Sequence, residues 1–184
     1  MPRRKILADR DVLASALGVI REHGPDGLTF ASLASACGLS GATLVQRFGS
    51  KPALLKAAMR HAWDLLDAST QEAIATAPQS AEGVIQMLLA LSHGYGDIET
   101  YADGLLMLRE DLRDPELRDR GKAWQAVLAE AIATRLPGHP REISNLILDQ
   151  WQGSLLWWSF DPRDKVEHYV ERRLRAFLAL VTGA

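Results

Sequence analysis

Apolar residues recur along the chain at the three- and four-residue spacing of one face of an α-helix. Near the start, Val12, Ala16, Leu17 and Ile20 mark such a stripe, and comparable stripes follow as far as Val181. No segment alternates between apolar and polar residues as a half-buried strand would. The pattern therefore predicts an all-α chain.

The stripes, and the glycines, prolines and capping residues between them, predict about nine helices. We expect the first helix to end near residue 23, where Gly24 and Pro25 interrupt the pattern. The other expected ranges are 30–37, 40–48, 51–75, 84–95, 98–112, 115–136, 140–160 and 163–182. The three short helices predict a head over residues 1–49, and the long ones predict a larger body over residues 50–184.

Three helix-capping residues, Thr29, Ser40 and Ser50, follow one another closely at the end of this head. Each hydroxyl can accept a hydrogen bond from an unpaired backbone N–H at a helix start. Gly38 separates the first two of these helices, and glycine tolerates a left-handed turn. A helix, a short glycine-containing turn and a steeply crossing second helix form a helix–turn–helix unit, whose second helix can enter the DNA major groove.

The second helix of this unit is expected to have one buried and one outward face. Leu39, Leu44 and Phe48 would anchor it to the rest of the head. The outward face would consist of Gly41, Ala42, Val45 and Gln46, with Thr43 and Arg47 beside it. Ordinary helical corners share this geometry, so DNA binding and a purely structural corner both remain open from the pattern alone.

Charge is distributed unevenly along the chain. The formal net charge is −2, yet residues up to Arg60 include nine basic and four acidic side chains, and the remainder is acidic. A basic head favours a polyanionic partner, although a solvated face without a partner would show the same balance. We expect Arg3, Arg4 and Lys5 to form an arm that adds phosphate or minor-groove contacts.

Residues 12–55, VLASALGVIREHGPDGLTFASLASACGLSGATLVQRFGSKPALL, resemble the N-terminal domain of TetR-family transcriptional regulators. Their apolar positions, glycine turns, caps and the ending Phe48, Ser50, Lys51 fall in register with that family. The resemblance implies a TetR-like fold and a homodimeric regulator, usually a repressor. Such a regulator leaves a palindromic double-stranded DNA operator when a small molecule binds to its C-terminal body.

The resemblance also assigns roles to individual residues of the head. Thr29 and Lys51 match positions that usually contact phosphates, while Ala42 and Val45 depart from the glycine and tyrosine that the family often has. Valine cannot donate the phosphate hydrogen bond that tyrosine makes, but it can contact a thymine methyl group. Arg47 is a candidate replacement phosphate ligand. The complete expected DNA-binding set is Thr29, Ser40, Gly41, Ala42, Thr43, Val45, Gln46, Arg47 and Lys51.

The expected helix over residues 140–160 has apolar residues on two faces, whereas a surface helix needs only one. The first face has Ile143, Ile147, Trp151, Leu155 and Trp158, and the second has Leu146, Gly153 and Trp157, with Phe160 nearby. This pattern predicts a homodimer in which the last two helices of each chain form a four-helix bundle. The alternative is that both faces are buried within one chain.

A small-molecule effector is expected to bind between the helices of the body, and the aromatic content favours an apolar or aromatic one. The candidate lining residues are Met87, Leu91, Tyr95, Leu105, Leu108, Trp124, Leu128, Trp151 and Trp157, with His93, Tyr101 and Gln152 as candidate polar anchors. Each of these side chains could instead be ordinary core or surface.

Catalytic and metal-binding patterns are poor. The five histidines are scattered, the single cysteine, Cys37, lies on an apolar helix face, and no phosphate-binding glycine loop occurs. We therefore expect a non-enzymatic protein without a metal or cofactor. No stretch has the length of a membrane span or a secretory signal, which predicts a cytoplasmic protein. The alternative function is a helical small-molecule-binding or scaffold protein that has lost DNA binding.

Overall fold

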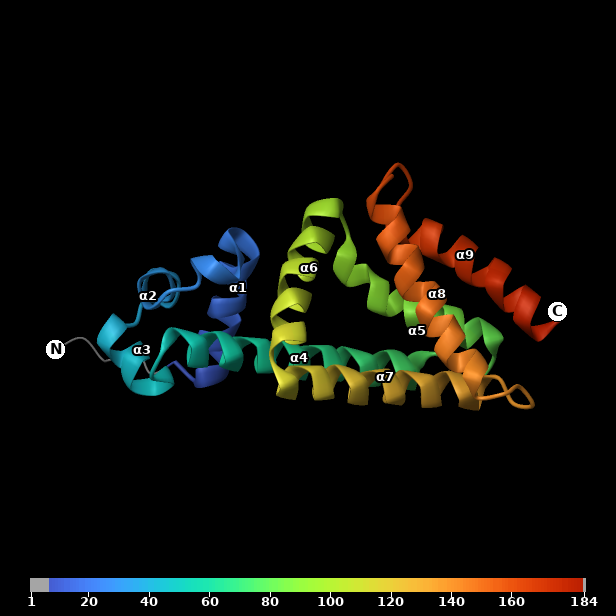
Figure 1. Cartoon of the computed structure of the whole chain (residues 1–184), viewed down its shortest axis with the longest axis horizontal. Helices are drawn as coiled ribbons and strands as arrows, with labels where there is room; N and C mark the ends of the chain where they lie inside the picture. Colours follow the sequence, from blue (N-terminus) through green and yellow to red (C-terminus); the bar gives the residue numbers. More distant parts are fainter. Residues whose placement is uncertain (1–6, 184) are drawn as a thin grey trace. The chain divides into compact units, whose positions relative to one another are not determined.

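The computed structural model describes residues 7–183, apart from the side chain of Tyr95. Over these residues the chain forms nine α-helices, one short 3-10 helix and no strand (Figure 1), which confirms the expected all-α fold. The helices are α1 (Asp9–Gly27), α2 (Phe30–Cys37), α3 (Gly41–Phe48), α4 (Lys51–Thr76), α5 (Ala81–Ser92), α6 (Ile98–Arg113), α7 (Pro115–Arg135), α8 (Glu142–Ser159) and α9 (Val166–Thr182), with η1 (His93–Tyr95) after α5.

The chain packs as two compact units. Unit 1 contains the residues up to Leu65 together with Leu105–Leu117, and unit 2 contains Leu66–Gly104 and the chain from Arg118 onward. The long helices α4, α6 and α7 each contribute to both units. The two units are defined by how the chain packs and do not test domain boundaries. The expected division into residues 1–49 and 50–184 therefore remains a prediction.

Unit 1 is organised around the apolar stripe of α1. Val12, Ala16 and Ile20 are buried there against Leu33 of α2 and Leu44 of α3. The start of α4 adds the buried side chains Leu54 and Ala58 to the same core. Three short helices thus obtain a core that none of them could form alone.

The helix α1 contains the break that the sequence predicts. Gly24 has a left-handed φ of 70°, and Pro25 follows it, so the regular helix is interrupted there before the chain turns toward α2. The N–H of Leu28 then donates to Pro25 O at 3.3 Å, which closes the turn. The short linker fixes the direction in which α2 leaves α1.

Unit 2 has a larger core, in which α8 packs against α9 and α5 packs against α9. Trp151 of α8 is its largest fully buried side chain, and its indole Nε1 donates to Ser92 Oγ at 2.9 Å. Ser92 in turn donates to Leu88 O at 2.8 Å. The polar edge of a buried tryptophan is therefore satisfied inside an apolar core.

Arg135, at the end of α7, is buried in unit 2 with a relative exposure of 2%. Its guanidinium donates to the backbone carbonyls of Ile74, Ala77 and Pro78 at 2.6–3.1 Å, and also to Ala131 O at 2.9 Å. Ile74 belongs to the last turn of α4, and Ala77 and Pro78 directly follow the helix, where helical partners are missing and the helix dipole is negative. Burial lowers the pKa of Arg135, yet a guanidinium remains charged in proteins. The residue therefore acts as a buried C-cap for α4.

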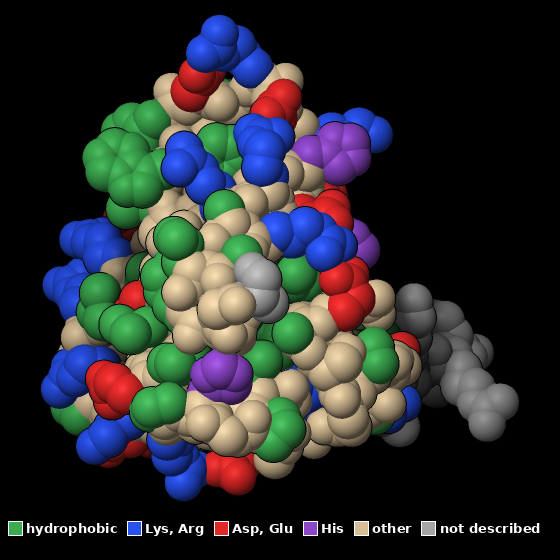
Figure 2. All heavy atoms as spheres, turned by 90° about the vertical axis from the view of Figure 1, so that its right-hand side faces the viewer, with side chains coloured by type: hydrophobic (Ala, Val, Ile, Leu, Met, Phe, Trp, Pro, Cys, Tyr) green, Lys and Arg blue, Asp and Glu red, His purple; other side chains and the backbone are tan. Residues whose placement is uncertain are grey.

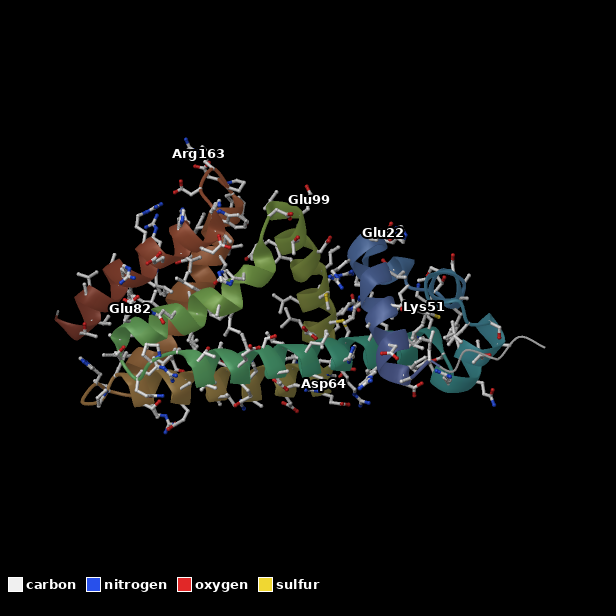
Figure 3. All side chains as sticks on the ribbon, turned by 180° about the vertical axis from the view of Figure 1, so that it is seen from behind. Glu22, Lys51, Asp64, Glu82, Glu99 and Arg163 are labelled. Atoms are coloured by element: carbon white, nitrogen blue, oxygen red, sulfur yellow. The ribbon has the colours of Figure 1, made fainter. Side chains whose placement is uncertain are left out.

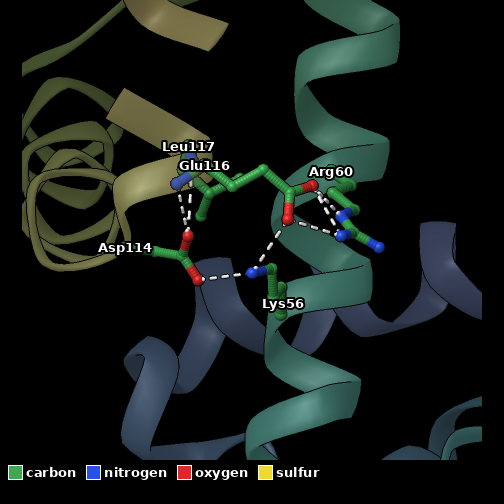
Figure 4. Close-up of polar contacts among 5 residues, drawn as sticks. All are labelled: Lys56, Arg60, Asp114, Glu116 and Leu117. Carbon is green, nitrogen blue, oxygen red and sulfur yellow. Dashed lines mark hydrogen bonds and ion pairs between the residues drawn. The ribbon is translucent and has the colours of Figure 1, made fainter. Parts of the chain in front are cut away.

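The turn between α6 and α7 is fixed to α4 within unit 1 by four charged residues. Asp114 caps α7 by accepting from Glu116 N at 2.9 Å, and its other carboxylate oxygen lies 2.9 Å from Lys56 Nζ (Figure 4). Lys56 also lies 3.0 Å from a Glu116 oxygen, and Arg60 bonds the same carboxylate. These contacts hold the start of α7 against the first turns of α4.

Candidate nucleic-acid interface

A complete capping box begins α2. Thr29 Oγ1 accepts from Ser32 N at 3.0 Å, and Ser32 Oγ accepts from Thr29 N at 2.9 Å. Ser32 Oγ also lies 2.9 Å from Gly27 O, to which it can donate. Thr29 was expected to cap this helix and Ser32 was not, although the three-residue spacing of two hydroxyl side chains was a usable sign.

The turn between α2 and α3 uses glycine as expected. Gly38 is left-handed with a φ of 74°, and its N–H donates to Ala34 O at 2.9 Å, which closes the end of α2. Ser40 then caps α3, because its Oγ accepts from Thr43 N at 3.2 Å. Ser40 Oγ and Thr43 Oγ1 are also hydrogen-bonded at 2.8 Å. The backbone at the start of α3 is therefore held by its own side chains.

The faces of α3 are sharply different in exposure. Leu44 is fully buried at 0%, and Phe48 packs against the same core. Val45 is 46% exposed, and Ser40, Ala42 and Gln46 are exposed as well. Two further expected contact residues, Gly41 and Thr43, are partly exposed. The structure thus presents a short helix whose outward surface consists of small and polar groups within unit 1.

The start of α4 lies next in the chain and is capped by Ser50, whose Oγ accepts from Ala53 N at 3.3 Å. Lys51 is the first residue of this helix (Figure 3) and is exposed. Its Nζ donates to Asp26 O at 2.7 Å, which places the ammonium beside the turn that leads into α2. A helix N-terminus with a cationic side chain beside it can bind an anion, because the unpaired N–H groups and the helix dipole add to the positive charge.

Arg47 makes contacts that the sequence did not predict. Its Nη1 donates to Leu7 O at 2.8 Å and lies 3.2 Å from Asp9 Oδ1, and its side chain is only 25% exposed. The last turn of α3 is thereby fastened to the first residues of α1. The expected role of Arg47 as a phosphate ligand would require this contact to open. The expected arm of Arg3, Arg4 and Lys5 lies outside the described residues.

The side chains expected to line an effector site divide between different environments. Met87, Leu128 and Trp151 are buried in the core of unit 2, and Leu91 and Trp124 pack against it. Trp124 Nε1 donates to Thr70 Oγ1 at 2.8 Å, and its ring lies 6.2 Å from that of Trp151. Trp124 also borders an open groove of about 310 Å³ between α4 and α7, together with Asp67, Thr70, Gln71, Arg120, Ala123 and Val127.

Other expected lining residues lie elsewhere. Leu105 and Leu108 belong to unit 1 and are exposed there, and the side chain of Tyr95 is outside the described set. Trp157 is 66% exposed, so it does not line the interior of unit 2. The reason is helical phase, because Trp158 takes the core-facing position at this level of α8. Of the candidate polar anchors, Tyr101 is buried edge-on against Trp158, whereas His93 and Gln152 are exposed.

The helix α8 has the two faces that the sequence predicts. Ile147, Trp151, Leu155 and Trp158 are buried on one face. The opposite face carries the exposed apolar side chains of Leu146, Leu156, Trp157 and Phe160. The rings of Trp157 and Phe160 lie 5.7 Å apart.

The described helices include none that is long and apolar enough to cross a membrane. Among the described residues, no group of three histidine, cysteine or acidic side chains is placed to hold a metal ion.

Residues 12–58 match the family described as bacterial regulatory proteins, tetR family. The matched residues include the capped α2, the turn at Gly38 and α3. No curated protein matches the chain. Solved structures match nearly its whole length. The TetR-family transcriptional regulator PfmR from Thermus thermophilus has a TM-score of 0.59 and 23% identity, over 91% of this chain and 96% of that one.

Two further solved structures contain small molecules. A protein from Saccharomonospora viridis, assigned as a transcriptional regulator and solved in complex with choline, has a TM-score of 0.73 and 20% identity, over 92% of this chain and 95% of that one. The multidrug binding protein EbrR, complexed with malachite green, has a TM-score of 0.67 and 18% identity, over 93% and 98%. Likeness at this level of identity shows a shared fold. Residues 12–58 therefore match the model of the tetR family of bacterial regulatory proteins, and the chain shares the fold of solved TetR-family transcriptional regulators.

Proposed function

We propose that the protein is a ligand-responsive, DNA-binding transcriptional regulator that acts as a homodimeric repressor. The observation that carries the proposal is the outward face of α3, on which Ala42, Val45 and Gln46 are exposed while Leu44 is buried. A rigid short helix with a small, polar surface can enter the major groove without a steric barrier. The family match over residues 12–58 supports the same assignment.

Specific contacts would come from α3, and phosphate contacts would come from its surroundings. Gln46 offers an amide that can bond two edge atoms of an adenine, and Val45 and Ala42 offer methyl groups to thymine. Lys51 and the N-terminus of α4 would hold one phosphate, and Thr29, which caps α2, would contact another. Ser40 and Thr43 are expected to adjust α3 against the backbone of the duplex.

A mobility-shift titration on the duplex that flanks the protein's own gene tests DNA binding. Gln46→Ala should weaken specific binding by about 5- to 150-fold, because a bidentate base contact contributes about 1–3 kcal/mol. Lys51→Gln should weaken binding to every duplex by a similar factor and reduce the salt dependence of the affinity. Gln125→Ala, at an exposed position on α7, is the matched control and should change neither.

The opposite result would favour the alternative function. If the wild-type protein binds no duplex even at low salt, the chain is a helical small-molecule-binding or scaffold protein without DNA binding. The contacts of Arg47 with Leu7 and Asp9 give that alternative a physical basis, because they engage a cationic side chain of α3 that would otherwise be available for DNA.

Dimerisation is expected through α8 and α9. The exposed face of α8 groups the apolar side chains of Leu146, Leu156, Trp157 and Phe160, and grouped apolar side chains are typical of interaction surfaces. A second copy of the same face would bury it across a two-fold axis. Two heads held in this way would meet successive major-groove segments of a palindromic operator.

The effector is expected to be an apolar or aromatic small molecule bound in unit 2. Buried or half-buried Met87, Trp124, Leu128 and Trp151 would supply an apolar, aromatic wall. Binding would release the operator by favouring a spacing of the two heads that fits DNA poorly. Because two proteins of this fold were solved with choline and with malachite green, these compounds are reasonable first probes.

Tryptophan fluorescence and operator release, measured together, test the effector site. A compound that binds should change the emission of Trp124 or Trp151 and lower the operator affinity. Both effects should depend on the concentration of the compound in the same way. Trp124→Phe should remove part of the spectral change and shift both curves. A compound that changes fluorescence but leaves operator affinity unaltered would contradict the coupling.

A further inference from the structure

Among the residues that the structure describes, the outward face of α3 carries no charged side chain. On the face of unit 2 shown in Figure 2, basic and acidic side chains lie among the hydrophobic ones, as is usual for a protein surface. The exposed residues of α3 are Ala42, Val45 and Gln46, and this helix contains no acidic residue and a single basic one, Arg47. Its outward face therefore presents methyl groups and one carboxamide.

The guanidinium of Arg47 is engaged at the start of α1. Its Nη1 donates to Leu7 O at 2.8 Å and lies 3.2 Å from the Asp9 carboxylate. Lys51, the next basic residue along the chain, belongs to α4, and its Nζ donates to Asp26 O at 2.7 Å. The cations on α3 and directly after it are therefore both engaged by oxygen atoms of unit 1.

The hydroxyl groups at the start of α3 are used within the helix. Ser40 Oγ accepts from Thr43 N at 3.2 Å, and it shares a second hydrogen bond, 2.8 Å long, with Thr43 Oγ1. These bonds cap the helix and leave little capacity for a base. The groups of α3 that can meet base edges are therefore the methyl groups of Ala42 and Val45 and the amide of Gln46.

Each base pair presents a different set of groups in the major groove. Guanine offers two acceptors that suit arginine or lysine, and cytosine offers an amino group that suits a carboxylate. Adenine suits the carboxamide of glutamine or asparagine, and thymine has a C5-methyl group that apolar side chains contact. The outward face of α3 thus has partners for adenine and thymine, and it lacks the charged partners of guanine and cytosine.

We propose that α3 selects A·T pairs in the half-site that it faces, and that Val45 determines this selection by packing against the methyl group of a thymine. The proposal rests on the proposed DNA binding. Val45 is the suitable side chain because it is 46% exposed, whereas Leu44 is buried and Ala42 is smaller. A G·C pair in the same place would put polar base edges against the apolar Val45, and burying polar groups without partners is costly.

Selection of duplexes from a random pool by the full chain is the first step of the test. The positions whose base preference weakens in Val45→Ala or Gln46→Ala should be A·T pairs. Arg47→Met should leave the identity of the preferred bases unchanged, because Arg47 is engaged elsewhere. A guanine preference that disappears in Arg47→Met would show that Arg47 leaves α1 and contacts a base, which would overturn the proposal.

Removal of single methyl groups from a selected duplex is the second step. Uracil differs from thymine only by the missing methyl group. At the thymine that Val45 contacts, uracil should raise the dissociation constant about 4-fold, which corresponds to about 0.8 kcal/mol for one buried methylene-sized group. With cytosine at that position the affinity should be lower still, and 5-methylcytosine should bind about 4-fold more tightly than cytosine for the same reason.

Val45→Ala tests whether Val45 is the residue responsible. In this variant the same uracil should have little further effect, because the side chain that covers the methyl group has been removed. Gln125→Ala, exposed on α7, is the control and should keep the uracil effect of about 4-fold. Thermal unfolding of both variants should stay close to that of the wild type, which excludes misfolding as the cause.

The contrary results separate this proposal from the proposed function. If the wild type binds no duplex even at low salt, DNA binding itself fails. If it binds duplexes but tolerates uracil at every thymine, or selects G·C pairs opposite α3, the methyl recognition is wrong and DNA binding stands. If uracil weakens the wild type and Val45→Ala by the same factor, another group contacts the methyl and the role of Val45 is wrong.

Discussion

Arg60 and Glu116 form a two-pronged ion pair that joins α4 to the first turn of α7. Arg60 Nε and Nη2 donate to the two carboxylate oxygens of Glu116, each at 2.7 Å. The hydrogen bonds from Arg60 and Lys56 hold the pKa of Glu116 below its ordinary value. The pair and its neighbours therefore connect segments of unit 1 by charge rather than by apolar packing.

Neutralising Glu116 should lower the melting temperature at neutral pH and low salt. The folded-state pKa of this carboxyl is depressed, so its contribution is present above the ordinary carboxyl pKa and is lost as the pH falls through the folded-state value. The difference between the wild type and Glu116→Gln should shrink in acid and in about 1 M salt. Glu72→Gln, at an exposed position on α4, should show neither dependence. A difference that is independent of pH and salt would contradict the ionic origin.

Asp111 should respond in the opposite direction. Its carboxylate accepts from Trp63 Nε1 at 3.0 Å, and burial raises the pKa of Asp111. A raised folded-state pKa means that stability is present below the unfolded pKa and is lost as the pH rises through the folded value. Asp111→Asn keeps an acceptor for Trp63 and removes the charge. Its melting temperature should therefore be higher than that of the wild type at neutral pH and the same as that of the wild type at low pH. Asp111→Ala should cost about 1 kcal/mol through the lost hydrogen bond.

Replacing Arg135 should be among the most damaging changes in unit 2. Arg135→Met fills much of the same volume but leaves the carbonyls of Ile74 and Ala77 without their donor, whereas Pro78 O keeps the backbone N–H of Ser80 at 3.0 Å. We expect a loss of at least about 2 kcal/mol, since each buried unpaired acceptor costs about 1–3 kcal/mol. Arg135→Lys should recover only part, because an ammonium lacks the planar fork that reaches several carbonyls. Urea unfolding monitored by tryptophan fluorescence measures the stability of both variants. An Arg135→Met variant as stable as the wild type would refute the capping role.

Gly83 and Gly18 should differ strongly when each is changed to alanine. A Cβ at Gly83 would lie 1.7 Å from Pro78 O, so the turn between α4 and α5 has to move. Gly83→Ala should therefore cost about 3 kcal/mol. A Cβ at Gly18 meets nothing within 4 Å, and Gly18→Ala should stabilise α1 by up to about 1 kcal/mol. Similar urea midpoints for the two variants would contradict the steric explanation.

The sequence predicted the features that depend on local order along the chain. The turn at Gly38, the cap at Asp114 followed by Pro115, and the two faces of α8 all follow from residues within one or two helical turns. Short-range patterns determine where helices begin, where they end and which side is apolar. The expected elements therefore agree closely with the observed ones.

Long-range contacts were not predictable in the same way. The carbonyls that Arg135 bonds at the end of α4 lie 57–61 residues away in sequence, and Arg47 lies 38 residues from Asp9. An exposed and a fully buried arginine look alike in a helical pattern. Trp157 was assigned both to the second face of α8 and to the lining of an effector site, and its 66% exposure agrees with the first of these assignments. Which expected DNA and effector contacts form is decided by the partner molecule, so those assignments remain predictions.

If the protein dimerises as proposed, the aromatic pair of Trp157 and Phe160 links its action to its own abundance. In a single chain both rings are exposed to water, and a single chain would offer the operator only one head. When most chains are single, halving their number cuts the pairs by about fourfold. Occupancy of the promoter would then fall more steeply than the concentration of the protein as cells dilute it by growth.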